Sequence, residues 1–302
     1  MSGILAKLFR WNNSKLIVSA NGIAEKVLKI LFFFSLTVYR LARPRSSKRS
    51  RKVMIHNFDS DLSLYIDRSR AMGAALYWTG FHEFREFLFL HRFLKPNMVF
   101  VDVGANLGEY SLFAAKRLTS GIILSFEPLP SIRSVLEKNI QINRFDNIRV
   151  FPFGLSDTNE RMTIHEFEDV HEGLATLYPG DRPSKTTVDV ELKKLDDIIT
   201  GSEIKKIDVI KMDIEGGELK ALQGSRKLIE LYHPVFMIEI NEQTYNTAGY
   251  TIGNVLQFFE EYHYYPCSIK KRGELERTAS LPAFGNIVFL PNENIISHSL
   301  VS

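Results

Sequence analysis

The eight residues from Val101 to Gly108 have the types and spacing of a nucleotide-binding turn. They follow an apolar run at 98–103 and lead into an amphipathic stretch at 108–118. A strand, a turn and a helix in that order point backbone N–H groups at a ligand, and glycines let the ligand approach the backbone closely. The segment predicts a cofactor site that includes four residues of the turn, Gly104, Ala105, Asn106 and Gly108.

The acid that precedes this turn discriminates between two adenosine cofactors. A dinucleotide fingerprint places glycines at its first, third and sixth positions, whereas Gly104 and Gly108 are four positions apart. The carboxylate of Asp102 would repel a pyrophosphate and attract the ammonium and sulfonium groups of S-adenosylmethionine. We therefore expect S-adenosylmethionine, with an NAD-linked sugar-modifying enzyme as the alternative.

A second acid lies where an adenosine ribose is usually bound. Glu127 follows the apolar run 122–126, is 19 positions beyond Gly108, and precedes Pro128. A carboxylate at the tip of the second strand can accept both ribose hydroxyls, in NAD and in S-adenosylmethionine sites alike. Ser156 and Asp157, after the third expected strand, are candidate contacts for the adenine edge.

An alternation of short β-branched runs and amphipathic segments begins at residue 98 and is typical of an α/β fold. A segment at 59–97, ended by Pro96, is expected to be a helical cover of the core. Two extra strands at 161–167 and 187–192 flank a variable loop at 168–186. The main strands are expected at 98–103, 122–126, 148–153, 207–213, 235–240, 264–269 and 286–290, with helices at 108–118, 130–143, 216–231 and 252–262.

The charge of the chain is divided unevenly. The segment 1–58 holds 12 Lys and Arg against one Glu, a net +11, and the remainder holds 26 against 34, a net −8. An acidic body argues against an enzyme that acts on nucleic acid. The single cysteine, Cys267, cannot form an internal disulfide, so a reducing compartment, by default the cytoplasm, is expected.

The basic segment 1–58 contains an apolar run, 30–39, of only ten residues. That is about half the length needed to cross a bilayer. The segment is expected either to lie at an anionic membrane surface, at the inner face of the membrane, or to pack on the body or on a second copy. A linker rich in basic residues, Ser and Pro is expected at 40–52.

Several motifs occur together in one order, and their combination resembles the FkbM family of methyltransferases. They are 102–110, 126–128, Asn139 with Asn143, 195–197, and 208–216 with Glu218. The resemblance covers roughly residues 80–290. It implies a class I methyltransferase (Rossmann-like) fold, a seven-stranded, mostly parallel sheet with one antiparallel strand, in a catalytic domain at 98–302 preceded by a helical N-terminal extension.

The resemblance also implies O-methylation of a hydroxyl on a sugar, a glycan or glycolipid, or a natural product. Asn143 then counts among the cofactor-binding residues, and Tyr110 packs over the methionine portion of the cofactor. A non-catalytic module that binds the cofactor and recruits a partner is the remaining alternative.

The end of the fourth main strand should, by the same resemblance, face the sulfonium. Asp213, which is also a cofactor-binding candidate, or a Lys211 whose pKa is lowered by burial, could take the proton of a hydroxyl acceptor. Glu215 and Glu239 are further catalytic candidates, and with Asp213 they could instead bind Mg²⁺. We favour a reaction without metal, because no histidine-rich set accompanies these acids.

Two histidines near the start of the variable loop, His165 and His171, are weaker candidates for contact with the acceptor. The loops that should select the acceptor, 59–95, 168–186 and 241–251, carry no signature that names one. The sequence leaves the oligomeric state open as well.

Overall fold

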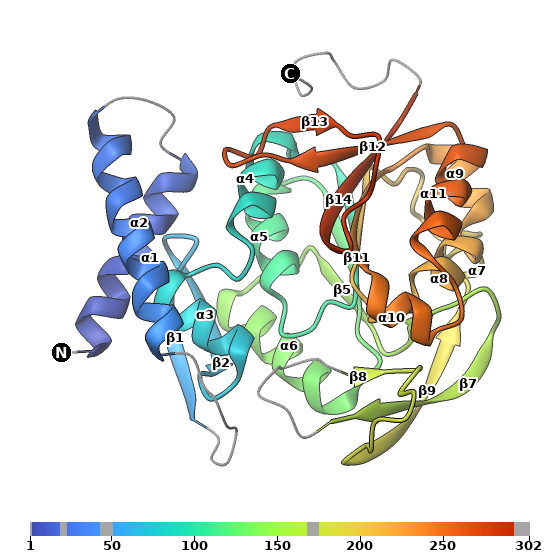
Figure 1. The fold of residues 1–302 in the computed structure, drawn as a ribbon, viewed down its shortest axis with the longest axis horizontal. Helices are drawn as coiled ribbons and strands as arrows, with labels where there is room; N and C mark the ends of the chain where they lie inside the picture. Colours follow the sequence, from blue (N-terminus) through green and yellow to red (C-terminus); the bar gives the residue numbers. More distant parts are fainter. Residues whose placement is uncertain (1, 19–22, 43–50, 168–174, 293–302) are drawn as a thin grey trace.

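The computed structural model describes residues 2–18, 23–42, 51–167 and 175–292. Figure 1 shows a central sheet with helices on both of its faces, a separate long-stranded ribbon at one end, and a pair of helices from the N-terminus at the side. The alternation of strands and helices expected from residue 98 onward is present.

The central sheet has eight strands in the order β13-β12-β14-β11-β10-β3-β4-β5. Without the short edge strand β13, it is the expected seven-stranded sheet, in which only β14 runs antiparallel to the others. The strands are β3 (Val99–Val103), β4 (Ile122–Phe126), β5 (Ile148–Phe151), β10 (Val209–Met212), β11 (Val235–Asn241), β12 (Tyr264–Ile269), β13 (Leu275–Arg277) and β14 (Phe284–Pro291).

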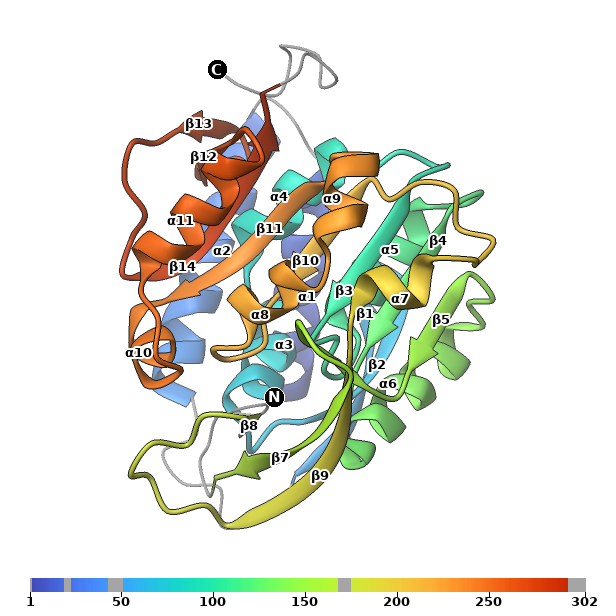
Figure 2. The same cartoon turned by 90° about the vertical axis from the view of Figure 1, so that its right-hand side faces the viewer.

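Apolar side chains alternate between the two faces of this sheet, as the pleat of a strand requires. On one face they pack with α4 (Phe84–Phe93), α5 (Glu109–Arg117) and α6 (Pro130–Asn143). On the other they pack with α7 (Leu195–Ile199), α8 (Glu218–Gln223), α9 (Arg226–Tyr232), α10 (Glu242–Thr247) and α11 (Ile252–Glu261). Figure 2 shows several of these helices beside the sheet.

The helix expected at 216–231 is two helices, α8 and α9. Gly224 separates them and packs so closely on Ser156 that a Cβ there would lie 2.0 Å from the Ser156 carbonyl oxygen. The side chain of Asp196 then accepts hydrogen bonds from the backbone N–H groups of Lys227 and Leu228, in the first turn of α9. The close approach and this cap explain why the helix is interrupted.

The two extra strands form a ribbon outside the central sheet. β7 (Glu160–Glu166) pairs antiparallel with β9 (Thr186–Lys193), and the short strands β6 (Gly154–Leu155) and β8 (Ala175–Thr176) complete this four-stranded sheet. One face of the ribbon carries a small apolar cluster that includes Ile164, Val190 and Leu192. Leu129, between β4 and α6, belongs to the same cluster, so the ribbon packs against the segment that follows β4.

The N-terminal part differs from the expectation in one respect. Residues 59–97 are not all helical, because β1 (Lys52–Phe58) and β2 (Leu62–Asp67) form an antiparallel hairpin before α3 (Ala71–Thr79) and α4. Asn139 and Asn143 on α6 bond the backbone of β2 at Tyr65 and Ser63 and so fix the hairpin on the body. The extension itself forms α1 (Ser2–Val18) and α2 (Ile23–Ala42).

Helix α2 runs on through residues 40–42, where a linker was expected, and most of that linker, 43–50, lies outside the described residues. None of the described helices combines the length and the apolar character needed to cross a membrane. Cys267 is buried as a free thiol.

Candidate active site

A cavity of about 600 Å³ opens at the carboxyl ends of the parallel strands, where open α/β sheets bind their ligands. The turn after β3, the ends of β4, β10 and β11, the ribbon, and the first residues of α3 all contribute to its wall. Ten predicted site residues line it, namely Gly104, Ala105, Asn106, Tyr110, Glu127, Pro128, Lys211, Asp213, Glu215 and Glu239.

The turn between β3 and α5 brings the backbone against the cavity. Gly104 has a φ of 76°, and a Cβ at this position would lie 2.0 Å from the carbonyl oxygen of Asp213. Only glycine fits there, because the turn passes directly over the end of β10. Gly108 also has positive φ but does not line the cavity, and it packs against Leu136 instead.

The carboxylate of Glu127 ties two parts of this wall together. It accepts hydrogen bonds from the backbone N–H of Asn106 and from that of Leu129, each at 3.0 Å. Burial raises the pKa of Glu127 to about 7, although both hydrogen bonds oppose the shift. Each bonded oxygen keeps a second lone pair, so the carboxylate can still accept a ligand hydroxyl.

The cavity is apolar beyond Glu127. Side chains from α6, β6, the ribbon and the segment after β8 form this part of the wall, and none of them was predicted from the sequence; they are Leu129, Ile132, Leu155, Ile164, Leu177 and Leu192. A flat aromatic base would be covered by such a surface. The other end of the cavity is acidic.

Asp102 does not line the cavity, and this corrects the expectation that it meets the cofactor directly. The side chain is fully buried, accepts a 2.5 Å hydrogen bond from Ser111 Oγ, and lies 3.9 Å from Lys211 Nζ. Burial raises its pKa, while Lys211 and Ser111 oppose the rise. Asp102 therefore acts on the cavity through the lysine that it faces.

The pKa of Lys211 is raised, whereas its candidacy as a general base required that burial lower it. Burial acts to lower the pKa of Lys211, but the carboxylates of Asp213 and Asp102 outweigh that effect and the pKa is raised. Its Nζ lies 3.4 Å from the Asp213 carboxylate and 4.9 Å from the centre of the Tyr110 ring. Lys211 is a fixed positive charge in the cavity wall.

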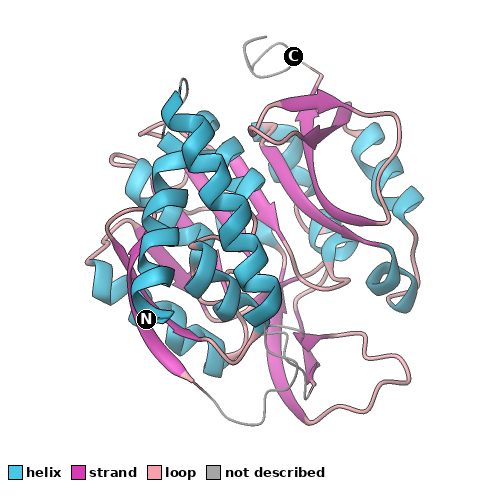
Figure 3. Cartoon of the chain, turned by 60° about the vertical axis from the view of Figure 1, so that its left-hand side comes forward, coloured by secondary structure: helices cyan, strands magenta, loops and turns pink. Residues whose placement is uncertain are grey.

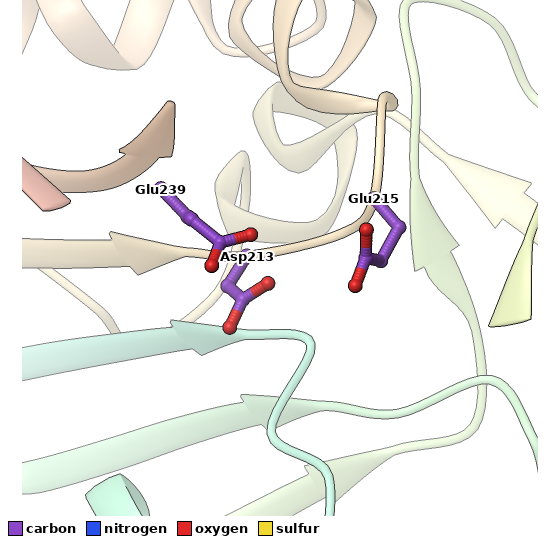
Figure 4. A group of neighbouring side chains, drawn as sticks. All are labelled: Asp213, Glu215 and Glu239. Atoms are coloured by element: carbon purple, nitrogen blue, oxygen red, sulfur yellow. The ribbon is translucent and has the colours of Figure 1, made fainter. Parts of the chain in front are cut away.

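Three carboxylates converge at the acidic end, at the tips of β10 and β11 (Figure 4). One oxygen of each of Asp213, Glu215 and Glu239 lies within 4.8 Å of the others. Burial first, and the neighbouring acids second, raise the pKa of Glu215 to about 8 and raise that of Glu239 as well. Within the described part of the chain, one oxygen of Glu215 is buried without a hydrogen-bond partner.

Glu218 holds the turn that carries these acids. Its carboxylate accepts a 2.9 Å hydrogen bond from the backbone N–H of Ile214 and another of the same length from Gly216. This pattern satisfies the free N–H groups before α8. Glu218 is therefore a structural residue of the turn.

A second acidic pair, Glu83 and Glu109, lines the same cavity and was not predicted from the sequence. Glu83 accepts 2.6 Å hydrogen bonds from Tyr110 Oη and from Asn286 Nδ2. Glu109 is 1% exposed and lines the cavity. One of its oxygens accepts a hydrogen bond from the backbone N–H of His82, and the other has no partner among the described residues. Burial raises the pKa of Glu109 to about 8.

Several predicted residues lie away from this cavity, so we no longer assign them to the site. Asn143 bonds β2, and buried Ser156 donates to its neighbour Asp157 at 3.1 Å. His165 is on the ribbon and faces Ser184, with 3.2 Å between the two side chains. His171 lies outside the described residues.

The lining fits S-adenosylmethionine on three counts. Glu127, the ribose acceptor, lies between an apolar compartment and an acidic one. The backbone lines the cavity at Gly104, where only glycine fits. A buried carboxylate oxygen of Glu109 has no partner among the described residues. An adenosine with an ammonium and a sulfonium matches this distribution of polarity.

The fold and this cavity define the class I methyltransferase architecture, with its seven-stranded core and a site over the ends of β3 and β4. Residues 102–266, more than half of the chain, match the family model described as the methyltransferase FkbM domain. The chain therefore belongs to the FkbM methyltransferase family.

Curated relatives share this part of the chain. Methyltransferase sdnD of Sordaria araneosa is 30% identical over 160 residues, and the match covers 43% of this chain and 61% of the relative. The 2-O-methyltransferase NoeI of Sinorhizobium fredii is 24% identical over 148 residues, 45% of this chain and 60% of the relative. The chain thus spans less than two thirds of the length of either relative.

A solved structure of methyltransferase FkbM from Methylobacillus flagellatus also aligns with this chain. The alignment covers 75% of this chain and 56% of that one, at 18% identity and a TM-score of 0.46.

Proposed function

We propose that this protein is an S-adenosylmethionine-dependent methyltransferase that methylates a hydroxyl of a sugar, a glycan or glycolipid, or a natural product, with residues 98–302 as its catalytic domain. The observation that carries the proposal is the cavity, in which the family's motif residues and the unpredicted lining together provide separate places for an adenosine and for a cation. The cofactor supplies an electrophilic methyl group when it is bound.

Glu127 would hold the ribose, and the apolar compartment beyond it would hold the adenine. The ammonium of the methionine portion would meet Glu109, whose free oxygen is otherwise buried without compensation. A cation at that oxygen removes the cost of an unpartnered buried acceptor. Gly104, in the turn that would face the cofactor, lies so close to the Asp213 carbonyl oxygen that it leaves no room for a side chain.

Asp213 is the residue that we propose to receive the acceptor's proton. Its side chain is 33% exposed and reaches the cavity, and its ion pair with Lys211 orients the carboxylate. Lys211 also offsets the negative charge of Asp102 beneath the site. Methyl transfer requires the hydroxyl in line with the methyl group, and a positioned carboxylate can align the acceptor through a hydrogen bond.

The relatives favour a hydroxyl acceptor but do not name one for this chain. The name of the relative from Sinorhizobium fredii describes it as a 2-O-methyltransferase. An acceptor with several hydroxyls would suit the acidic end of the cavity, because carboxylates accept hydrogen bonds from hydroxyl groups. We place the reaction in the cytoplasm.

A divalent cation such as Mg²⁺ is a second means of acidifying the acceptor. Asp213, Glu215 and Glu239 would be its ligands, since their oxygens gather within 4.8 Å and Glu215 has a free buried oxygen. We favour the metal-free reaction because Lys211 already places a positive charge beside Asp213. Activity that disappears on treatment with EDTA and returns with Mg²⁺ would establish the alternative.

The test is incubation of the protein with methyl-labelled S-adenosylmethionine and glycan extracts, followed by mass spectrometry of the products. The wild type should transfer the label to a hydroxyl. Asp213→Asn should bind S-adenosylhomocysteine as the wild type does, yet transfer at least about 100-fold more slowly. Full activity in Asp213→Asn would remove this residue from the role, and no transfer to any acceptor would favour a non-catalytic cofactor-binding module.

A further inference from the structure

The two N-terminal helices form an antiparallel pair along one side of the molecule, in front of the body in Figure 3. Their inner faces are firmly attached. Asn13 Nδ2 donates 2.7 Å to the carbonyl oxygen of Thr79 on α3, Arg10 Nε donates 2.7 Å to Asn57 Oδ1 on β1, and Phe32 on α2 contacts Phe84 on α4 with 4.5 Å between the ring centroids. The pair is therefore part of the folded body and not a separate arm.

The outer faces of the same helices carry large apolar side chains that no other described part of the chain covers. Seven of the nine large apolar side chains that are most exposed among the described residues lie on α1 and α2, and intervals of three, four or seven positions put those of each helix on one face. They are Ile4, Leu8 and Trp11 on α1, and Ile30, Phe33, Phe34 and Leu41 on α2. We refer to these seven residues as the outer stripes.

Basic residues accompany the outer stripes. Lys7 and Lys15 are exposed on the same face of α1, and Arg40 is exposed beside Leu41 on α2. The whole segment 1–58 carries +11, whereas the rest of the chain carries −8. A helix with aromatic and aliphatic residues among lysines is typical of binding at a lipid headgroup boundary.

We propose that α1 and α2 dock this protein on an anionic lipid bilayer, with the outer stripes in the headgroup region and the basic residues against the lipid phosphates. The positive charge of segment 1–58 favours an anionic bilayer over a second copy of the chain as the partner of the outer stripes. Two copies that met through the outer stripes would bring two segments of +11 together, and like charges at an interface oppose association. An anionic bilayer attracts the segment and repels the acidic body.

The docked helices would hold the cavity close to the membrane. Helix α3 bonds to α1 through Thr79 and Tyr77, and the same helix contributes Ala71 and Met72 to the cavity wall. If the proposed function holds, an acceptor carried on a lipid is the class of substrate that this arrangement serves. Docking itself does not depend on methyl transfer.

Flotation with vesicles tests docking on the full chain. Vesicles of phosphatidylcholine with phosphatidylglycerol should carry the wild type, vesicles of phosphatidylcholine alone should carry far less of it, and high salt should release it. The double variant Trp11→Ser/Phe33→Ser should bind the anionic vesicles at least about tenfold more weakly, because two large apolar side chains no longer enter the lipid. The matched control is Leu231→Ser, which removes a side chain that is 68% exposed on α9, and it should float as the wild type does.

S-adenosylhomocysteine affinity and the melting temperature report whether the double variant folds, and both should equal those of the wild type. Flotation of the double variant at the wild-type level would overturn the proposal. A dimer of the wild type that the double variant dissociates would overturn it as well, because the outer stripes would then be an interface between copies. Equal binding to both kinds of vesicle would contradict the role given to the basic residues.

Discussion

Lys211 is the residue on which the charges of the site depend. It is 4% exposed and lies between buried Asp102 and the catalytic candidate Asp213. Lys211→Met would leave Asp102 buried with Ser111 as its only remaining partner among those described, and breaking a buried ion pair from one side typically costs about 3 kcal/mol or more. We expect that loss in the free energy of unfolding, measured with urea.

The matched control is Lys206→Met, which breaks a 3.0 Å ion pair with Asp208 on a side chain that is 44% exposed. It should change the free energy of unfolding by less than about 1 kcal/mol. Equal losses in the two variants would contradict the part given to Lys211.

Glu109 is the second residue whose role can be isolated. Glu109→Gln should weaken binding of S-adenosylhomocysteine about tenfold, because an amide cannot ionise to balance the charge of the ammonium. It should leave binding of 5′-methylthioadenosine, which has no amino-acid portion, unchanged. Calorimetric titration of both ligands measures the difference.

Glu86→Gln is the control for that titration. Glu86 is another buried glutamate and lies on α4, three positions after Glu83. Burial raises the pKa of Glu86 too, but its side chain does not line the cavity. The variant should bind both ligands as the wild type does. An equal loss for both ligands in Glu109→Gln would mean that Glu109 supports the cavity as a whole and does not meet the ammonium.

Most of the residues that could be predicted lie at the carboxyl end of a strand. Gly104, Glu127 and Asp213 directly follow β3, β4 and β10, and Glu239 lies near the end of β11, so the order of the strands brings them to one edge. Glu83 and Glu109 lie in or beside helices instead. Their place in the site depends on how the segment before α4 packs on α5, which spacing along the chain does not reveal.

Substitution of Gly104 tests whether the turn between β3 and α5 must lie against the end of β10. Gly104→Ala would place a Cβ 2.0 Å from the carbonyl oxygen of Asp213, so β3 and β10 could not both keep their positions. We expect a loss of about 2 kcal/mol or more in stability and the loss of S-adenosylhomocysteine binding. Thermal unfolding and calorimetry would measure the two effects.

Gly201→Ala distinguishes the effect of a steric clash at Gly104 from the effect of backbone strain. Gly201 has a φ of 79°, similar to the 76° of Gly104, but nothing lies within 4 Å of the position of its Cβ. This variant should lose only about 1 kcal/mol and should bind the ligand normally. Equal behaviour of the two variants would show that strain alone explains the effect at Gly104.

The strands of the central sheet were predictable because each is a short apolar run bounded by turn residues. The hairpin of β1 and β2 was not predicted, although Leu62, Leu64 and Ile66 are buried in strict alternation on β2. The basic composition before it resembles a linker, and the bonds from Asn139 and Asn143 that fix β2 connect positions far apart in the chain. The edge strand β13 is too short to leave a signal.

The whole molecule holds several buried glutamates whose pKa values are raised, and its stability should therefore depend on pH. Glu109 has a pKa of about 8 and Glu127 of about 7, against 4.5 for an ordinary glutamate. Between about pH 4.5 and about pH 8, the folded protein therefore binds more protons than the unfolded chain. Stability contributed by these groups is present below about pH 4.5 and is lost as the pH rises through about 8.

Urea unfolding across this window should show a free energy of unfolding that falls toward its alkaline end, and Glu109→Gln should make the fall shallower. A free energy that rises steadily over the same window, in the wild type, would mean that these carboxylates are ionised in the folded protein at no cost.

Calorimetric titration of the full chain with S-adenosylhomocysteine and with NAD measures whether the cavity is a site for S-adenosylmethionine. We predict one molecule of S-adenosylhomocysteine bound per chain, weakened in Glu109→Gln, and no heat of binding with NAD. Binding of NAD in place of S-adenosylhomocysteine would show that the cavity is not a site for S-adenosylmethionine.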